Sequence, residues 1–138
     1  MNRKLAQTIV EEFYAFALTV NDKETPTRVL DRLLADDFRS VNSQEQKTKA
    51  QFSAQMEGVW KAVPDLKWSI QDTIFEGDKI VVRSIATGTP KGPFMGKERD
   101  GKTSFKMDTI DIHELSADNR VLRVHHLEDW ATVMKQLG

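Results

Sequence analysis

The sequence predicts an α+β domain, with helices in the first half of the chain and an antiparallel sheet in the second. Up to Asp65, apolar residues recur at spacings of three and four, which is typical of amphipathic helices. From Leu66 onward they alternate with polar residues, which is typical of strands with one buried face. Turns or loops join the long strands, so no parallel crossover is needed. We therefore expect three N-terminal helices packed into a strongly curved antiparallel sheet that forms a cone.

The first helix is expected over residues 3–20. Its apolar stripe consists of Leu5, Ile9, Phe13, Phe16 and Val20. A second helix begins at Thr25-Pro26, where a capping hydroxyl precedes a proline suited to the first turn. A short connecting strand is expected over residues 36–42.

A third helix is expected from about Thr48 to Pro64. Its apolar face consists of Phe52, Met56, Val59, Trp60 and Val63. Such a stripe predicts core packing. Met56 and Trp60 are also candidates for lining a cavity.

The period of two then predicts strands over 66–74, 80–89 and 104–115, followed by a final strand from Arg120. Glu76-Gly77-Asp78-Lys79 is a hairpin turn of the acidic-glycine type. The glycine-rich segment between Gly88 and Gly101 is expected to be a long loop. It is either an ordinary crossover or a lid whose Phe94 and Met95 cover an apolar ligand.

Length and composition favour one domain, residues 1–138, with a single core. The formal charge of −1 gives no electrostatic case for nucleic acid or a membrane surface as a partner. No apolar run approaches membrane-spanning length. The chain has no cysteine, which excludes disulfides, thiolate chemistry and cysteine-based zinc sites. These features are compatible with the cytoplasm, which we expect to be its location.

The last nineteen residues, RVLRVHHLEDWATVMKQLG, combine a strand end, two acids, two histidines and a short helix. Alternation places His125, Leu127 and Asp129 on one strand face, and His126 with Glu128 on the other. Asp129 has two candidate roles, a cap for the last helix and a catalytic acid/base. The second role requires burial that raises its pKa.

Asp111 and His113 share one face of the third long strand, where they can line a cavity wall. Asp111 is alternatively a surface charge paired with Arg83 or Arg123. A metal site built from His113, His125 and Asp129 is conceivable, but the spacing matches no recognised metal motif, and we expect none.

Four stretches, in the right order over most of the chain, carry a family resemblance. They are Val63-Pro64-Asp65-Leu66, the hairpin from Glu76 to Arg83, the loop from Gly88 to Lys102, and the ending formed by Asp111-Ile112-His113, Asp129 and Gln136-Leu137-Gly138. Together they resemble the SnoaL-like polyketide cyclases, which have the ketosteroid-isomerase-like (cystatin-type α+β barrel) fold. The resemblance implies an intramolecular aldol ring closure, no metal and no organic cofactor, with Asp129 as the acid/base and His113 at a position that is histidine in some members.

The chain departs from the family pattern around the expected pocket mouth. Pro90 replaces the histidine of the family's glycine-rich loop, and His125 replaces a tryptophan four positions before Asp129. These changes predict a substrate that differs from the aromatic polyketides of true cyclases.

We therefore expect a small cofactor-independent enzyme that acts on an apolar carbonyl compound by aldol-type cyclisation or isomerisation. Asp129 is the expected acid/base, with His113 or His125 assisting. The expected cavity residues are Phe52, Met56, Trp60, Trp68, Phe94 and Met107. A homodimer formed through the outer sheet face is also expected. The alternatives are a hydrolase or dehydratase on the same fold, or a non-catalytic ligand-binding or dimerisation module.

Overall fold

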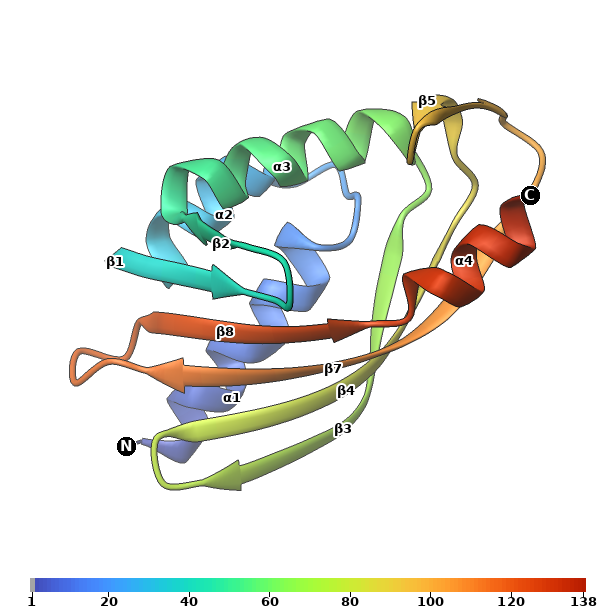
Figure 1. The fold of residues 1–138 in the computed structure, drawn as a ribbon. Coiled ribbons are helices and arrows are strands. Elements are labelled where there is room, and N and C mark those ends of the chain that lie inside the picture. The colour runs from blue at the N-terminus through green and yellow to red at the C-terminus, as the bar shows by residue number, and fades with distance from the viewer. Residues whose placement is uncertain (1) are drawn as a thin grey trace.

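A computed structural model describes residues 2–138, and its helices lie against one face of a curved six-stranded sheet (Figure 1). The helical elements are α1 (Arg3–Glu12), η1 (Phe13–Ala17), α2 (Pro26–Leu33), α3 (Lys49–Ala62) and α4 (Trp130–Leu137). The strands are β1 (Leu34–Val41), β2 (Gln46–Thr48), β3 (Lys67–Glu76), β4 (Lys79–Gly88), β5 (Lys91–Phe94), β6 (Lys97–Asp100), β7 (Phe105–Leu115) and β8 (Val121–Glu128). The α+β class and the predicted order of the main elements are therefore confirmed.

The first predicted helix is an α-helix that widens into one π-helical segment. Asn2 caps α1 by accepting a hydrogen bond from the Leu5 backbone N–H. The π-helix η1 directly follows α1, and its residues Phe13, Tyr14 and Ala17 are buried. A π-turn widens the buried face because each turn contains more residues, and such turns are frequent at functional sites. Tyr14 continues the buried stripe of Ala6, Val10 and Phe13 on this face.

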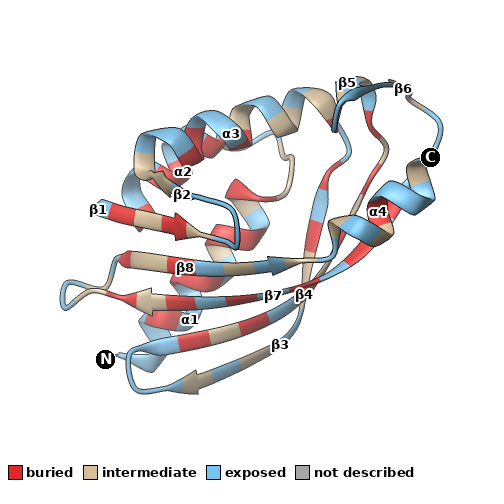
Figure 2. Cartoon of the chain, viewed as in Figure 1, coloured by how far each residue is buried: buried red, intermediate tan, exposed pale blue. Residues whose placement is uncertain are grey.

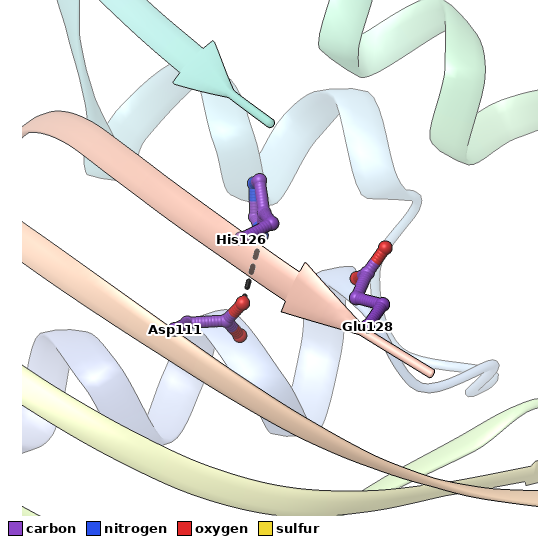
Figure 3. A group of neighbouring side chains, drawn as sticks. All are labelled: Asp111, His126 and Glu128. Carbon is purple, nitrogen blue, oxygen red and sulfur yellow. Dashed lines mark hydrogen bonds and ion pairs between the residues drawn. The ribbon is translucent and has the colours of Figure 1, made fainter. Parts of the chain in front are cut away.

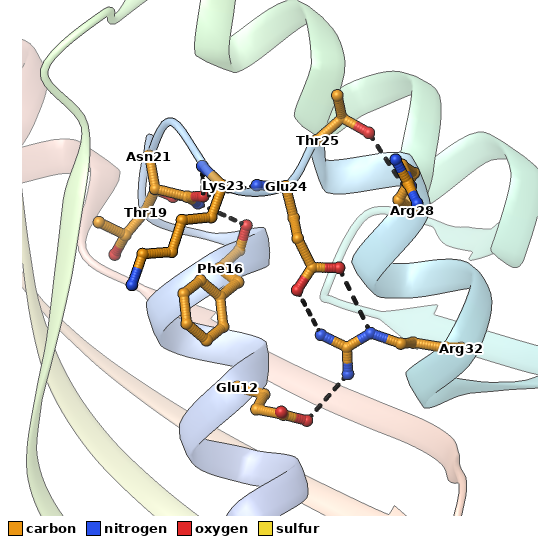
Figure 4. A network of polar contacts seen from close by, with 9 residues as sticks. All are labelled: Glu12, Phe16, Thr19, Asn21, Lys23, Glu24, Thr25, Arg28 and Arg32. Atoms are coloured by element: carbon orange, nitrogen blue, oxygen red, sulfur yellow. Dashed lines mark hydrogen bonds and ion pairs between the residues drawn. The ribbon is translucent and has the colours of Figure 1, made fainter.

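A polar network holds α1 against α2 (Figure 4). Arg32 of α2 donates to Glu12 at 2.9 Å and to Glu24 at 2.6 Å. These ion pairs lie at the surface, where solvent screening makes the contribution of each pair small. The turn before α2 is organised by Asn21, whose Oδ1 accepts two backbone N–H groups, and Thr25 caps α2 as predicted.

The third helix begins with a reciprocal cap. Thr48 accepts from the Gln51 backbone N–H, and the Gln51 side chain accepts from the Thr48 backbone N–H. This capping box fixes where β2 ends and α3 begins. It thereby also fixes the position of Lys47, the residue before the cap.

The sheet has the strand order β2-β1-β8-β7-β4-β3. The pairs β3–β4, β4–β7 and β7–β8 are antiparallel, as predicted. The long strands therefore need no parallel crossover, as predicted. The short connecting strand β1 runs parallel to β8, a pairing that the sequence did not predict. The helix α3 and the strands β2 to β7 separate β1 from β8 in sequence, and turn chemistry says nothing about such distant pairs. The sheet is curved but does not close into a barrel.

The predicted loop between Gly88 and Gly101 contains a second, small sheet, formed by the hairpin β5–β6. Its turn, Met95-Gly96, has φ values of 52° and 78°. Two consecutive positive φ values are typical of a tight hairpin turn. The segment is therefore an ordered flap, and Phe94 stacks on Phe105 with ring centroids 6.4 Å apart.

The core lies between the helices and the concave face of the sheet, as the burial colours show (Figure 2). On β7 every second residue from Phe105 to Leu115 is buried, which confirms the predicted common face of Phe105, Met107, Thr109, Asp111 and His113. No helix among residues 2–138 has the length and apolar character required to cross a membrane.

Candidate functional site

A cavity of about 60 Å³ lies between α3, the concave side of the sheet and the β5–β6 hairpin. Its wall is mainly apolar and includes Phe52, Met56, Trp68, Phe94, Phe105 and Trp130. Its polar lining residues are Ser40, Asn42, Lys47, Gln55, His126 and Glu128. Four of these six lie on the adjacent strands β2, β1 and β8, and Asn42 directly follows β1, so one wall of an apolar cavity is polar.

The centre of this wall is a histidine–aspartate pair (Figure 3). Asp111 of β7 and His126 of β8 lie directly opposite each other in the sheet register. His126 Nδ1 lies 2.9 Å from Asp111 Oδ1. The His126 side chain is only 8% exposed and Asp111 is fully buried. The imidazole is further held by Phe52, whose ring stacks on it at 5.8 Å.

Two more buried groups continue the network behind Asp111. The Tyr14 hydroxyl donates to Asp111 Oδ2 at 2.5 Å and lies 2.8 Å from His113 Nε2. Since the hydroxyl proton is given to Asp111, His113 donates from Nε2 to the Tyr14 oxygen. Burial lowers the pKa of His113 to about 4, and this neutral ring is consistent with one donor nitrogen. Both Asp111 oxygens are thus occupied.

His126 is tuned toward its protonated form. Desolvation lowers its pKa, but the hydrogen bond and charge of Asp111, helped by the charge of Glu128, outweigh that effect and raise the pKa overall. The second ring nitrogen, Nε2, is buried and has no hydrogen-bond partner within residues 2–138. In its protonated form, which Asp111 favours, His126 offers an unused Nε2–H donor beside the cavity.

Glu128 is tuned toward a stronger base. It is half-buried at the end of β8, and its Oε1 accepts from Trp130 Nε1 at 3.0 Å. Desolvation raises its pKa, and the negative charge of Asp111 adds to the effect, while His126 opposes it. A carboxyl group with a raised pKa, beside a cavity, is a candidate general acid/base.

Asp129 lies elsewhere. It caps α4 by accepting from the Thr132 backbone N–H at 3.2 Å and from the Thr132 hydroxyl at 2.6 Å. These hydrogen bonds lower its pKa, and the side chain is exposed and does not line the cavity. The expected burial and raised pKa of Asp129 are therefore wrong, and the alternative cap is confirmed. Its role in catalysis stays a prediction.

The other predicted site residues divide into two groups. Phe52, Met56, Trp68 and Phe94 line the cavity as expected. Four others do not: His113 lies behind Asp111, His125 is exposed on the outer face, Met107 is buried in the core, and Trp60 donates to the Ala17 carbonyl at 3.0 Å. Met95 lies outside the cavity at the hairpin turn. The surface pairing of Asp111 is wrong, because Arg83 pairs with Asp72 and Asp111 is buried.

The sequence contains a signal for the correct face of β8. Val124 is apolar and shares its face with His126 and Glu128, whereas Asp129 lies one position beyond Glu128. One position along a strand changes the face. Helical spacing indicates that Tyr14 is buried, but nothing in the sequence indicates its partners Asp111 and His113. Lys47 had no comparable signal, because the helix cap that follows it sets its position.

Asp111, His126 and Glu128 also offer ligand atoms within 4.8 Å of one another. Imidazole and carboxylate groups are ligands for zinc and iron. The hydrogen bond between His126 and Asp111 already uses one atom from each, so the same geometry is explained by an oriented acid–base pair.

The fold and the site define a curved α+β domain with an acid–base cluster beside an apolar cavity. The family model of the SnoaL-like polyketide cyclases matches residues 8–137, and the chain belongs to this family. Membership supports a function of the cyclase or isomerase type. A comparison with curated proteins finds no match.

Solved structures agree on the fold. TsrD from Streptomyces laurentii is 28% identical, with a TM-score of 0.86, and the match covers 100% of this chain and 98% of that one. A putative SnoaL-like polyketide cyclase from Jannaschia sp. CCS1 is 21% identical, with a TM-score of 0.85 and coverage of 97% and 92%. IdmH, a putative polyketide cyclase from Streptomyces antibioticus, is 21% identical, with a TM-score of 0.81 and coverage of 96% and 98%.

Proposed function

We propose that this protein is a small cofactor-independent enzyme that moves a proton next to the carbonyl of a small apolar compound, leading to aldol-type ring closure or isomerisation. One observation carries the proposal. Glu128, with a raised pKa, and His126, whose Nε2 has no partner among residues 2–138 and is a donor in the protonated ring, line the same apolar cavity. A base and a hydrogen-bond donor on one wall are what enolisation requires.

The chemistry then has two steps. Ionised Glu128 removes the proton from the carbon next to the carbonyl, and the electron pair of that C–H bond forms an enolate. The enolate oxygen accepts a hydrogen bond from His126 Nε2. The enolate carbon then attacks a second carbonyl of the same molecule, or it is reprotonated at another carbon. Glu128 returns its proton, so acid and base are regenerated.

The choice of Glu128 over Asp129 follows from their surroundings. An exposed carboxylate with a lowered pKa is a weak base at neutral pH, whereas desolvation strengthens Glu128. Asp111 is fully buried, and both of its oxygens accept hydrogen bonds, so it acts as a positioning group for His126.

Deuterium exchange tests the assignment without knowledge of the natural substrate. Small ketones such as butanone and cyclopentanone are incubated with the protein in D₂O, and loss of the α-proton signal is followed by NMR. We expect Glu128→Gln to lose about 10²–10⁴-fold of the enzyme-dependent exchange, which is the usual contribution of general acid–base catalysis. The neighbouring Asp129→Asn variant is the matched control and should retain it.

The opposite pattern, with Asp129→Asn inactive and Glu128→Gln active, would assign the base to Asp129 and overturn the cavity assignment. A wild-type protein that binds ketones without any exchange would support a binding module instead. Circular dichroism of both variants separates loss of function from loss of fold.

A further inference from the structure

The polar wall of the cavity contains more hydrogen-bond donors than the two-step chemistry uses. Lys47 of β2 lies opposite Ser40 of β1 in the sheet register, and both line the cavity. Only 18% of the Lys47 side chain is exposed. An ammonium group in an apolar surrounding is unfavourable unless it is paired.

The contact between Lys47 and its partner leaves N–H donors of the lysine ammonium unused. Its Nζ contacts the Glu45 carboxylate, which is 53% exposed and lies at the surface. An ammonium group has three N–H donors, so at least one can point elsewhere. Desolvation is the largest influence on the pKa of both His126 and Glu128, and the Lys47 charge is a smaller influence that lowers each. The ammonium therefore lies close enough to act on the acid–base pair.

Two further donors face the same cavity. Trp68 is only 8% exposed, and its Nε1 is buried without a hydrogen-bond partner in the described chain. Asn42 lines the cavity too, and its Oδ1 already accepts from the backbone N–H groups of Gln44 and Glu45. Only its N–H₂ group is left for a ligand. Lys47, Asn42, Trp68 and His126 together require an occupant rich in acceptor oxygens.

We propose that the carbonyl substrate also carries a carboxylate, which Lys47 binds while the substrate's carbonyl oxygen faces His126. The substrate class is then a small apolar oxo acid. This inference rests on the proposed function, because it takes the same cavity and the same role for His126. The described cavity lining contains no arginine for bidentate recognition, so the ammonium of Lys47 is its cationic side chain besides the imidazole of His126.

The test compares a carboxylate with its neutral analogue. Benzoate and benzamide are titrated into the protein, and binding is followed by NMR chemical-shift changes of the Trp68 indole and His126 imidazole signals. We expect benzoate to bind about tenfold more tightly or better, because hydrogen bonds to charged groups are the stronger ones. Lys47→Met should remove this preference, and Lys47→Arg, which keeps the charge, should retain part of it.

Lys49 provides the matched control. It is two positions away, its side chain is 17% exposed, and it pairs with Asp31 and Asp36 outside the cavity. Lys49→Met should therefore keep the benzoate preference. Equal binding of benzoate and benzamide would overturn the inference. So would an undiminished preference in Lys47→Met, or equal losses in the Lys47 and Lys49 variants.

Failure of this inference is distinguishable from failure of the proposed function. Glu128→Gln should abolish ketone exchange yet bind benzoate at least as well as wild type, since it removes a competing negative charge. If exchange depends on Glu128 but benzoate is not preferred over benzamide, the proposed enzymatic function stands and the proposal of an oxo acid substrate is wrong. If benzoate is preferred but no exchange occurs, the carboxylate site at Lys47 stands and the role of Glu128 as a base is wrong.

Discussion

His126 Nδ1 and Asp111 Oδ1 lie 2.9 Å apart at directly opposed positions of β8 and β7. The pair makes the register of the sheet part of the site, because the backbone pairing aligns the two side chains. Their separation also decides which ring nitrogen remains free. With Nδ1 committed to Asp111, only Nε2 can serve a ligand.

Replacing Asp111 by Asn removes the charge that raises the pKa of His126. We expect that pKa to fall, since desolvation then acts with less opposition. Ketone exchange at neutral pH should fall by about 10–100-fold, which is the usual weight of a hydrogen bond to a charged group. Measurements are the NMR titration of the His126 ring and the pH profile of exchange.

Asp108→Asn is the control for this variant. Asp108 lies on the same strand but faces solvent, so neither the His126 titration nor exchange should change. An Asp111→Asn protein with an unaltered His126 titration would show that Asp111 does not tune the imidazole.

Removing the Tyr14 hydroxyl leaves two buried atoms, Asp111 Oδ2 and His113 Nε2, without their hydrogen-bond partner. In Tyr14→Phe, Asp111 loses a donor at 2.5 Å and His113 Nε2 loses its acceptor. We expect the free energy of unfolding to fall by about 1–3 kcal/mol, which is the penalty for an unsatisfied buried group. Urea denaturation measures it, and the His126 titration should shift as well.

The buried hydroxyl of Ser84, 2.6 Å from that of Thr109, supplies a comparison outside the network. Ser84→Ala should cost stability while leaving the His126 titration unchanged. A Tyr14→Phe protein as stable as wild type would mean that the hydroxyl contributes nothing to holding Asp111.

His113 makes stability depend on pH in a defined direction. Desolvation lowers the pKa of His113 to about 4 in the folded chain, whereas a histidine exposed to water has a pKa of 6.5. Between these two pH values the unfolded chain binds a proton that the folded chain does not. The contribution of neutral His113 to the free energy of unfolding is therefore complete above about pH 6.5 and is lost as pH falls toward 4. The loss amounts to about 3 kcal/mol over that window.

The pH dependence of unfolding in wild type and in His113→Gln measures this contribution. Glutamine retains an N–H donor for Tyr14 but does not titrate, so its stability should change less between pH 6.5 and 4. Parallel curves for the two proteins over that window would contradict the burial of a neutral His113.

Much of the fold could be predicted because local chemistry determines it. The alternation from Phe105 to Leu115, the Thr48 cap and the Glu76–Lys79 turn each act within a few residues. The parallel pairing of β1 with β8 could not be predicted this way. It joins segments about eighty residues apart, and neither segment encodes its partner.

The candidate site was predicted only in part for the same reason. The strand face that holds Asp111 and His113 follows from alternation alone. Choosing between Glu128 and Asp129 requires knowing which face of β8 meets the core. The family motif matches Asp129, one residue after the Glu128 that lines the cavity. The contacts of Tyr14 with Asp111 and His113 bridge about a hundred residues, so only the folded chain shows them.

The outer face of the sheet carries exposed apolar side chains on β3, β7 and β8. Ile74, Val81, Ile112 and His125 form a row across β3, β4, β7 and β8, and Ile110 lies opposite Leu127 beside it. Ile74 is 60% exposed and Leu127 is 68% exposed. Contiguous exposed apolar residues mark interaction surfaces, and the same face on two identical chains can pair with itself about a twofold axis. We propose a homodimer, with sedimentation at about twice the chain mass of 15.8 kDa.

A charge in the middle of this row should separate the chains. Ile112→Lys places an ammonium group where two copies would meet, and burying it unpaired is strongly unfavourable. Leu5→Lys is the control, since Leu5 is 41% exposed but lies on α1, away from the sheet's outer face. We expect Ile112→Lys to sediment as a monomer and Leu5→Lys as a dimer. Wild type that remains monomeric at micromolar concentrations would rule out self-association through this face, and a dimeric Ile112→Lys protein would place the interface elsewhere.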